Sequence, residues 1–98
     1  MSFIASSLFT LVSENTNNVR TERTYMLGSE RKVVVSLKYN SHICADAYVL
    51  EPHDHTWYDC DGVEHVERRD WLRISHDDDA PVELLLARAY GALMCYRA

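Results

Sequence analysis

The chain has 98 residues, of which 47% are hydrophobic and 26% are charged, and its formal net charge is −5. This length and composition indicate a soluble globular protein with one core, and we treat residues 1–98 as a single compact domain. The negative charge disfavours direct contact with nucleic-acid phosphates or with an anionic membrane, since both need a basic face. The N-terminus lacks the pattern of a secretory signal, and three widely spaced cysteines do not suit a disulfide framework. We therefore expect a reduced, cytoplasmic protein.

The first segment predicts a helix. Its apolar stripe runs through residues 3–13 and consists of Ile4, Leu8, Leu11 and Val12. A strand is the alternative, because Thr10 and Val12 are β-branched. The next segment, residues 14–23, is polar and Asn-rich and predicts a loop.

Two strands are predicted from alternating apolar residues at 32–39 and 43–50, after a short strand at 24–27. A two-residue turn between the two longer strands would set Asp46 opposite Val35, among apolar neighbours. A three-residue loop at 40–42 avoids this and is the predicted register, because a one-residue slip changes the buried face. Its pairs are Tyr39 with Ile43, Leu37 with Ala45 and Val35 with Ala47. His42 then lies in a solvated turn.

The dipeptide Asp61-Gly62 predicts a hairpin with a two-residue turn, since both central positions of that turn need positive φ. The arms are residues 56–60 and 63–67, and a further strand is expected at 70–75. In this register Asp59 faces Glu64, and like charges in direct opposition are destabilising. A cation should therefore lie nearby: Arg68 or Arg69, a metal ion, or a basic partner.

The last element is a predicted helix at 82–96. Asp77, Asp78 and Asp79 precede it as N-capping residues, with Pro81 and Glu83 in the first turn. It is apolar on most of its surface, and Ala87, Gly91 and Cys95 form a small-residue groove that would suit a homodimer. The predicted fold is an α+β two-layer sandwich: an N-terminal helix, then a three- to five-stranded antiparallel meander covered by the C-terminal helix.

Residues 51–83 contain 11 of the 15 acidic residues, four of the five histidines and both tryptophans. Aromatic side chains among carboxylates suit a protein partner with a basic surface, because aromatic residues often anchor interfaces and charge speeds association. Capping by the aspartates and burial of the tryptophans are the plainer interpretations. The candidate partner-binding residues are Asp54, Trp57, Asp59, Asp61, Glu64, Glu67, Asp70, Asp77, Asp78 and Asp79.

The same region holds a histidine and cysteine cluster that could suit zinc, which prefers nitrogen and sulfur ligands. Its members are His53, His55, Cys60 and His65. Their spacing is not a standard zinc pattern, and ordinary polar histidines are the favoured interpretation. The chain carries no phosphate-binding loop, GxSxG or HExxH motif, so neither an enzyme nor a cofactor is expected.

In its size, its acidity and its lack of catalytic motifs, the chain resembles small phage or mobile-element accessory proteins, including acidic anti-CRISPR inhibitors. The resemblance implies a non-enzymatic protein, in the host cytoplasm if phage-encoded, that occludes the basic surface of a nucleic-acid-handling complex. Residues 54–79 would then mimic phosphates. Two alternatives remain: a metal-binding module on the histidine and cysteine hairpin, and a structural protein that self-associates through the C-terminal helix.

Overall fold

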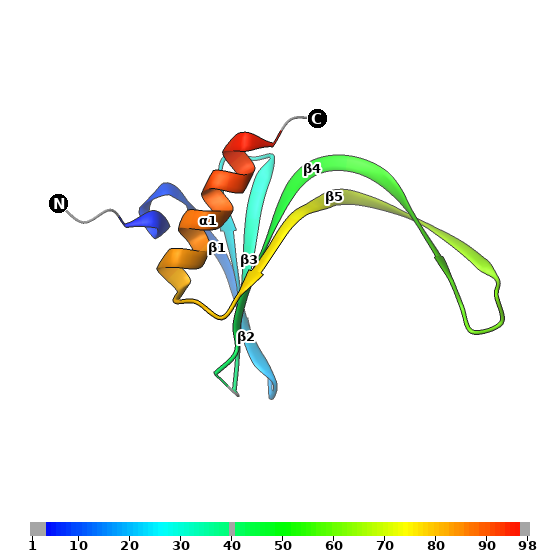
Figure 1. Cartoon of the computed structure of the whole chain (residues 1–98), viewed down its shortest axis with the longest axis horizontal. Coiled ribbons are helices and arrows are strands. Elements are labelled where there is room, and N and C mark those ends of the chain that lie inside the picture. Colours follow the sequence, from blue (N-terminus) through cyan, green and yellow to red (C-terminus); the bar gives the residue numbers. More distant parts are fainter. Residues whose placement is uncertain (1–3, 40, 97–98) are drawn as a thin grey trace.

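The computed structural model describes residues 4–39 and 41–96 and shows one antiparallel sheet with an α-helix packed on one of its faces (Figure 1). The five strands lie side by side in the order in which they occur in the chain. A single 3-10 turn, η1 (Ala5–Leu8), precedes them. The strands and the helix are β1 (Thr10–Thr16), β2 (Arg20–Met26), β3 (Arg31–Lys38), β4 (Ile43–Tyr58), β5 (Glu64–Asp78) and α1 (Val82–Cys95).

The predicted N-terminal helix is wrong, and with it the predicted α+β sandwich: the fold is mostly sheet, with one C-terminal helix. Residue 3, where that helix was expected to start, lies outside the described residues. Leu11 and Val12 belong to β1 and, like Ile4, are about half exposed. Leu8 packs against the core, but the stripe as a whole does not face it. Phe9 is buried instead, with its ring edge-to-face against Tyr25 and Tyr90. Pairing with β2 outweighs the helical spacing in this segment.

The loop expected at residues 14–23 is also wrong, because β1 and β2 run through most of it. The two strands pair from Thr10 opposite Met26 to Thr16 opposite Thr21. The side chain of Asn17 makes the turn by accepting the backbone N–H groups of Val19 and Arg20, at 2.8 and 3.0 Å. This end of the ribbon is polar on both faces, so it carries no alternation that would mark it as strand.

The β3–β4 pair has the predicted buried face but not the predicted partners. The observed pairs are displaced by two residues, and they include Leu37 opposite Ile43, Val35 opposite Ala45 and Val33 opposite Ala47. A shift of two keeps every side chain on its own face, whereas a shift of one reverses them all. The loop extends back to Lys38, whose N–H donates to the carbonyl of His42 at 2.9 Å. Asn40, placed in this loop by the prediction, lies outside the described residues.

The core lies between this sheet face and α1. Leu85, Leu86 and Leu93 of the helix are fully buried against small and β-branched residues of β3 and β4. The helix begins at Val82, but the predicted aspartate cap is absent: the N-cap residue is Pro81 and makes no side-chain cap hydrogen bond. The carboxylate of Glu83 instead accepts the N–H of Ser6 at 3.1 Å, which ties α1 to the N-terminal segment.

Strands β4 and β5 continue well beyond the other strands. The last β3–β4 pair is Arg31 opposite Val49, so residues 52–70 form a two-stranded extension that we call the β-arm. Figure 1 shows this arm curving away from α1, and the molecule measures 55 × 35 × 21 Å. The β4–β5 register has irregularities at 47/48 and 50/53, and β-bulges of this kind bend a strand and increase its twist. A two-stranded ribbon is marginally stable in water by itself.

Two glycines offer a matched test of this backbone. Gly91 lies inside α1 with nothing within 4 Å of an added Cβ, whereas Gly62, in the turn of the β-arm, has φ +78°. We expect Gly91→Ala to raise the free energy of unfolding by about 0.5–1 kcal/mol and Gly62→Ala to lower it by about 1 kcal/mol. Urea unfolding measures both. A Gly91→Ala variant that lost stability only at high protein concentration would contradict the expectation and indicate helix-mediated self-association.

Candidate functional site

The turn of the β-arm differs from the predicted one by one residue. Trp57 pairs with His65 and Tyr58 with Glu64, so the expected pairing of Asp59 with Glu64 is wrong. The N–H of Asp59 donates to the carbonyl of Val63 at 3.1 Å, which leaves a three-residue loop at 60–62. The left-handed glycine at position 62 closes it, as a bulge-type hairpin requires.

Contacts of Asp59 explain this register. One carboxylate oxygen accepts the N–H groups of Asp61 and Val63, both at 2.9 Å. The other lies 2.8 Å from Nε2 of His65, whose ring stacks on Trp57 with centroids 4.3 Å apart. The group expected near Asp59 is therefore a histidine rather than Arg68 or Arg69. This one-residue difference in register also places Glu64 on the opposite face of the ribbon from Asp59, which removes the predicted like-charge contact.

These contacts predict a pH dependence at the tip. The hydrogen bond from His65 is the largest of the effects that lower the pKa of Asp59 below its ordinary 3.8, followed by the N–H of Val63. Because the folded-state pKa lies below the unfolded one, the ionised carboxylate stabilises the turn above pH 3.8, and the effect is lost as the pH falls through the lowered pKa. Amide chemical shifts of Asp61 and Val63 should titrate with a midpoint below 3.8. A midpoint at or above that value would contradict these contacts.

The β-arm has two chemically different faces. Paired residues share a face and successive residues alternate. One face, which we call the histidine face, carries His53, His55, Trp57, Asp59, His65, Glu67 and Arg69. The other, which we call the acidic face, carries Asp54, Thr56, Tyr58, Glu64, Val66, Arg68 and Asp70.

The acidic face exposes apolar side chains between carboxylates. Tyr58 is 66% exposed and Val66 is 62% exposed, and the two lie diagonally across the ribbon. Arg68 is the one cation of this face, and it lies 3.4 Å from Asp54 with both side chains more than 60% exposed. An ion pair so exposed contributes little to stability. The face therefore keeps an excess of negative charge.

The predicted partner-binding residues do not form one patch. Glu64 and Asp78 stand at opposite ends of the 15-residue β5, about 45 Å apart along the strand. Asp77 is bound to Arg88 of α1 at 3.1 Å, and Asp79 contacts His42. Of the predicted set, the acidic face holds Asp54, Glu64 and Asp70, the tip holds Asp61, and the histidine face holds Trp57, Asp59 and Glu67. Tyr58 was not in the predicted set, and its alternation with Trp57 was the signal that could have found it.

The candidate zinc ligands of the histidine and cysteine cluster do not converge either. His65 is hydrogen-bonded to Asp59, and Cys60 is exposed in the turn. Nδ1 of His53 lies 3.0 Å from the carbonyl of Glu51. Within residues 4–39 and 41–96, the cluster with metal-ligand spacing is a different one, formed by His42, Asp78 and Asp79. Sequence reasoning missed it because its members meet only through the pairing of β4 with β5.

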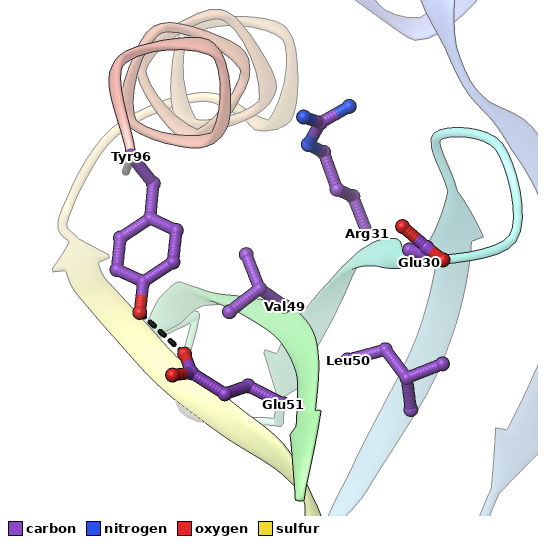
Figure 2. A pocket seen from close by; sticks show the side chains of 6 residues that line it. All are labelled: Glu30, Arg31, Val49, Leu50, Glu51 and Tyr96. Atoms are coloured by element: carbon purple, nitrogen blue, oxygen red, sulfur yellow. Dashed lines mark hydrogen bonds between the residues drawn. The ribbon is translucent and has the colours of Figure 1, made fainter. Parts of the chain in front are cut away.

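A shallow pocket of about 210 Å³ lies at the root of the β-arm (Figure 2). In it, the hydroxyl of Tyr96 donates to the carboxylate of Glu51 at 2.5 Å, and this bond raises the pKa of Tyr96. Arg31 and Glu30 stand on the other side of the pocket, across Val49. The space is smaller than the sites that enclose most small ligands. The Tyr96–Glu51 bond anchors the end of α1 to the strand that leads into the arm.

No protein-family model, curated protein or solved structure matches the chain. In the described ranges, no helix combines the length and the apolar character needed to cross a membrane. The geometry and charge of the β-arm are therefore the features from which a function can be inferred.

Proposed function

We propose that the chain is a small, non-enzymatic binding protein whose β-arm docks its acidic face on a basic surface of a partner protein. The observation that carries the proposal is the exposure of Tyr58 and Val66 on an arm that projects away from the core. Aromatic residues are common energetic anchors of interfaces. Burial of these two side chains by a partner removes apolar area from water, and it also stabilises a ribbon that no other element of residues 4–39 and 41–96 covers.

Charge supplies the specificity of this docking. The β-arm, residues 52–70, carries six acidic residues against two arginines, a net charge of −4, while the whole chain carries −5. Such a concentration of charge on one projecting element attracts basic surfaces and raises the association rate. The acidic residues at 77–79 have partners within the fold and take no part in this contact.

The partner class that fits is a nucleic-acid-handling protein complex, because its binding groove presents a basic surface. An acidic arm in that groove competes with the nucleic acid, so the expected consequence of docking is inhibition. A cytoplasmic location, in the host cytoplasm if the chain is phage-encoded, follows from this partner class.

The test is affinity capture with matched charge reversals. Tagged wild-type protein, the double variant Asp54→Lys with Glu64→Lys, and the control Glu14→Lys on β1 are incubated with cell extract at low and high salt. We expect a basic protein to be retained by the wild type and the control at low salt, to elute at high salt, and to be lost from the double variant. Its nucleic-acid binding should fall when the wild-type protein is added. Equal retention by the double variant would contradict the proposal.

A further inference from the structure

His42, Asp78 and Asp79 come together at the end of β5 that lies farthest from the turn of the β-arm. His42 belongs to the turn between β3 and β4, and the two aspartates end β5 and begin the connection to α1. One ligand atom from each residue lies within 4.8 Å of the other two. Nδ1 of His42 is 3.0 Å from Asp79, and its Nε2 is 3.8 Å from Asp78.

The charges of this cluster are not balanced by a permanent cation. Among residues 4–39 and 41–96, no lysine or arginine lies within ion-pairing distance of Asp78 or Asp79, and their side-chain partners are imidazoles. The neighbouring arginines form ion pairs with other carboxylates: Arg88 with Asp77 and Arg73 with Asp46. Two carboxylates next to imidazole nitrogens form a donor set that a divalent cation would neutralise.

His76 adds an independent indication of a ligand. Its Nδ1 lies 2.6 Å from the carboxylate of Asp46, and its Nε2 lies 3.9 Å from the carboxylate of Asp78. Histidines that bind metals usually donate their second ring N–H to a carboxylate or carbonyl, which fixes the ring for coordination. His76 is held in this way, with its other nitrogen on the side of the cluster.

We propose that His42, Asp78 and Asp79 bind a zinc ion, with His76 turning inward as the fourth ligand. Zinc takes nitrogen and oxygen ligands at about 2.0–2.2 Å, so the ligand atoms of a tetrahedral site lie about 3.4 Å apart. Asp79 and Asp78 face different nitrogens of His42, at 3.0 and 3.8 Å, so the imidazole turns to present one nitrogen to the ion. One ligand atom from each of the three residues already lies within 4.8 Å of the others, so the side-chain movement required is small.

The backbone is already suited to the site. The N–H of Asp79 donates to the carbonyl of Ile43 at 3.0 Å, so the two segments that supply the ligands are fixed against each other. The ion joins the β3–β4 turn to the connection between β5 and α1, and it thereby fastens the helix to the sheet. The site lies away from the acidic face of the β-arm, so its test does not depend on the proposed function.

The test is calorimetric titration of the full chain with Zn²⁺, with Co²⁺ as a spectroscopic substitute. We expect one ion per chain, visible Co²⁺ bands of tetrahedral intensity, and a higher Tm with zinc than without it. His42→Gln and, separately, Asp78→Asn should each weaken Zn²⁺ binding by at least about tenfold, because each removes a ligand. His55→Gln on the β-arm is the matched control and should bind as the wild type does.

Circular dichroism in the absence of metal establishes that each variant is folded, so that weaker binding reports on the site. Three results would overturn the proposal. One is the lack of saturable Zn²⁺ binding by the wild type. Another is unchanged affinity in a folded His42→Gln variant. The third is loss of binding in His55→Gln, which would move the metal to the β-arm.

Discussion

Leu85→Ala is expected to lower the free energy of unfolding by about 2–5 kcal/mol, the usual cost of emptying a buried leucine site. Leu84→Ala, one position earlier in α1, should change it by less than about 0.5 kcal/mol. Leu85 is fully buried between the helix and the sheet, whereas Leu84 is 43% exposed. Urea unfolding followed by circular dichroism measures both variants on the same helix.

The pair also tests whether α1 has a second partner. If Leu84→Ala destabilised the protein as much as Leu85→Ala does, the exposed side of the helix would be covered in solution. That result would contradict the packing described above and would favour self-association through α1. Sedimentation at two protein concentrations would then be expected to show a dimer.

Tyr58→Ala is expected to weaken binding of the captured partner by at least about tenfold, because buried aromatic anchors commonly contribute 2 kcal/mol or more at an interface. Tyr39→Ala is the control, since Tyr39 is 65% exposed and Tyr58 66% exposed. Tyr39 lies at the end of β3 and outside the β-arm, and its hydroxyl donates to the carbonyl of Asn17 at 2.8 Å. Surface plasmon resonance with the purified partner measures both variants.

Equal effects of the two tyrosines would show that the contact is not centred on the acidic face. Loss of binding in Tyr39→Ala alone would place the contact at the β2–β3 side of the sheet. Either outcome would contradict the proposed function. Neither would bear on the fold or on the proposed zinc site.

The sequence revealed the elements that face the core. Val33 and Val35 alternate with more exposed residues, and the apolar residues of α1 recur at helical spacing, so both elements were predicted where they occur. Burial on one face imposes this periodicity. The ribbon of β1 and β2 has little such constraint, because most of its residues are at least partly exposed. Its strands follow from the pairing of β2 with β3 and of β1 with β2, which a local pattern does not encode.

Hydrophobic periodicity could not predict the register of the β-arm either, and here the reason is different. Asp61-Gly62 suits both a two-residue turn and the three-residue loop that is observed. The choice depends on contacts across the ribbon: the hydrogen bonds accepted by Asp59 and the stacking of His65 on Trp57. The cluster of His42, Asp78 and Asp79 was missed for a related reason, since His42 meets Asp78 only when the start of β4 pairs with the end of β5, as Cys44 does with Asp78.

The length of β4 and β5 was also unexpected, and it separates the acidic residues of this region along the strands. The sequence predicted one acidic segment, but the fold places its two ends far apart and in different surroundings. At one end, acidic residues surround exposed apolar side chains, and at the other they lie among histidines. Opposite faces of the arm likewise carry different chemistry, because successive residues alternate.

The most direct test of the central claim is amide hydrogen exchange of the protein alone and bound to its captured partner. We expect slower exchange in the bound state at residues 54–68 of the β-arm and unchanged exchange in β1 and β2. Protection of the exposed side of α1, with the β-arm exchanging as fast as in the free protein, would contradict it.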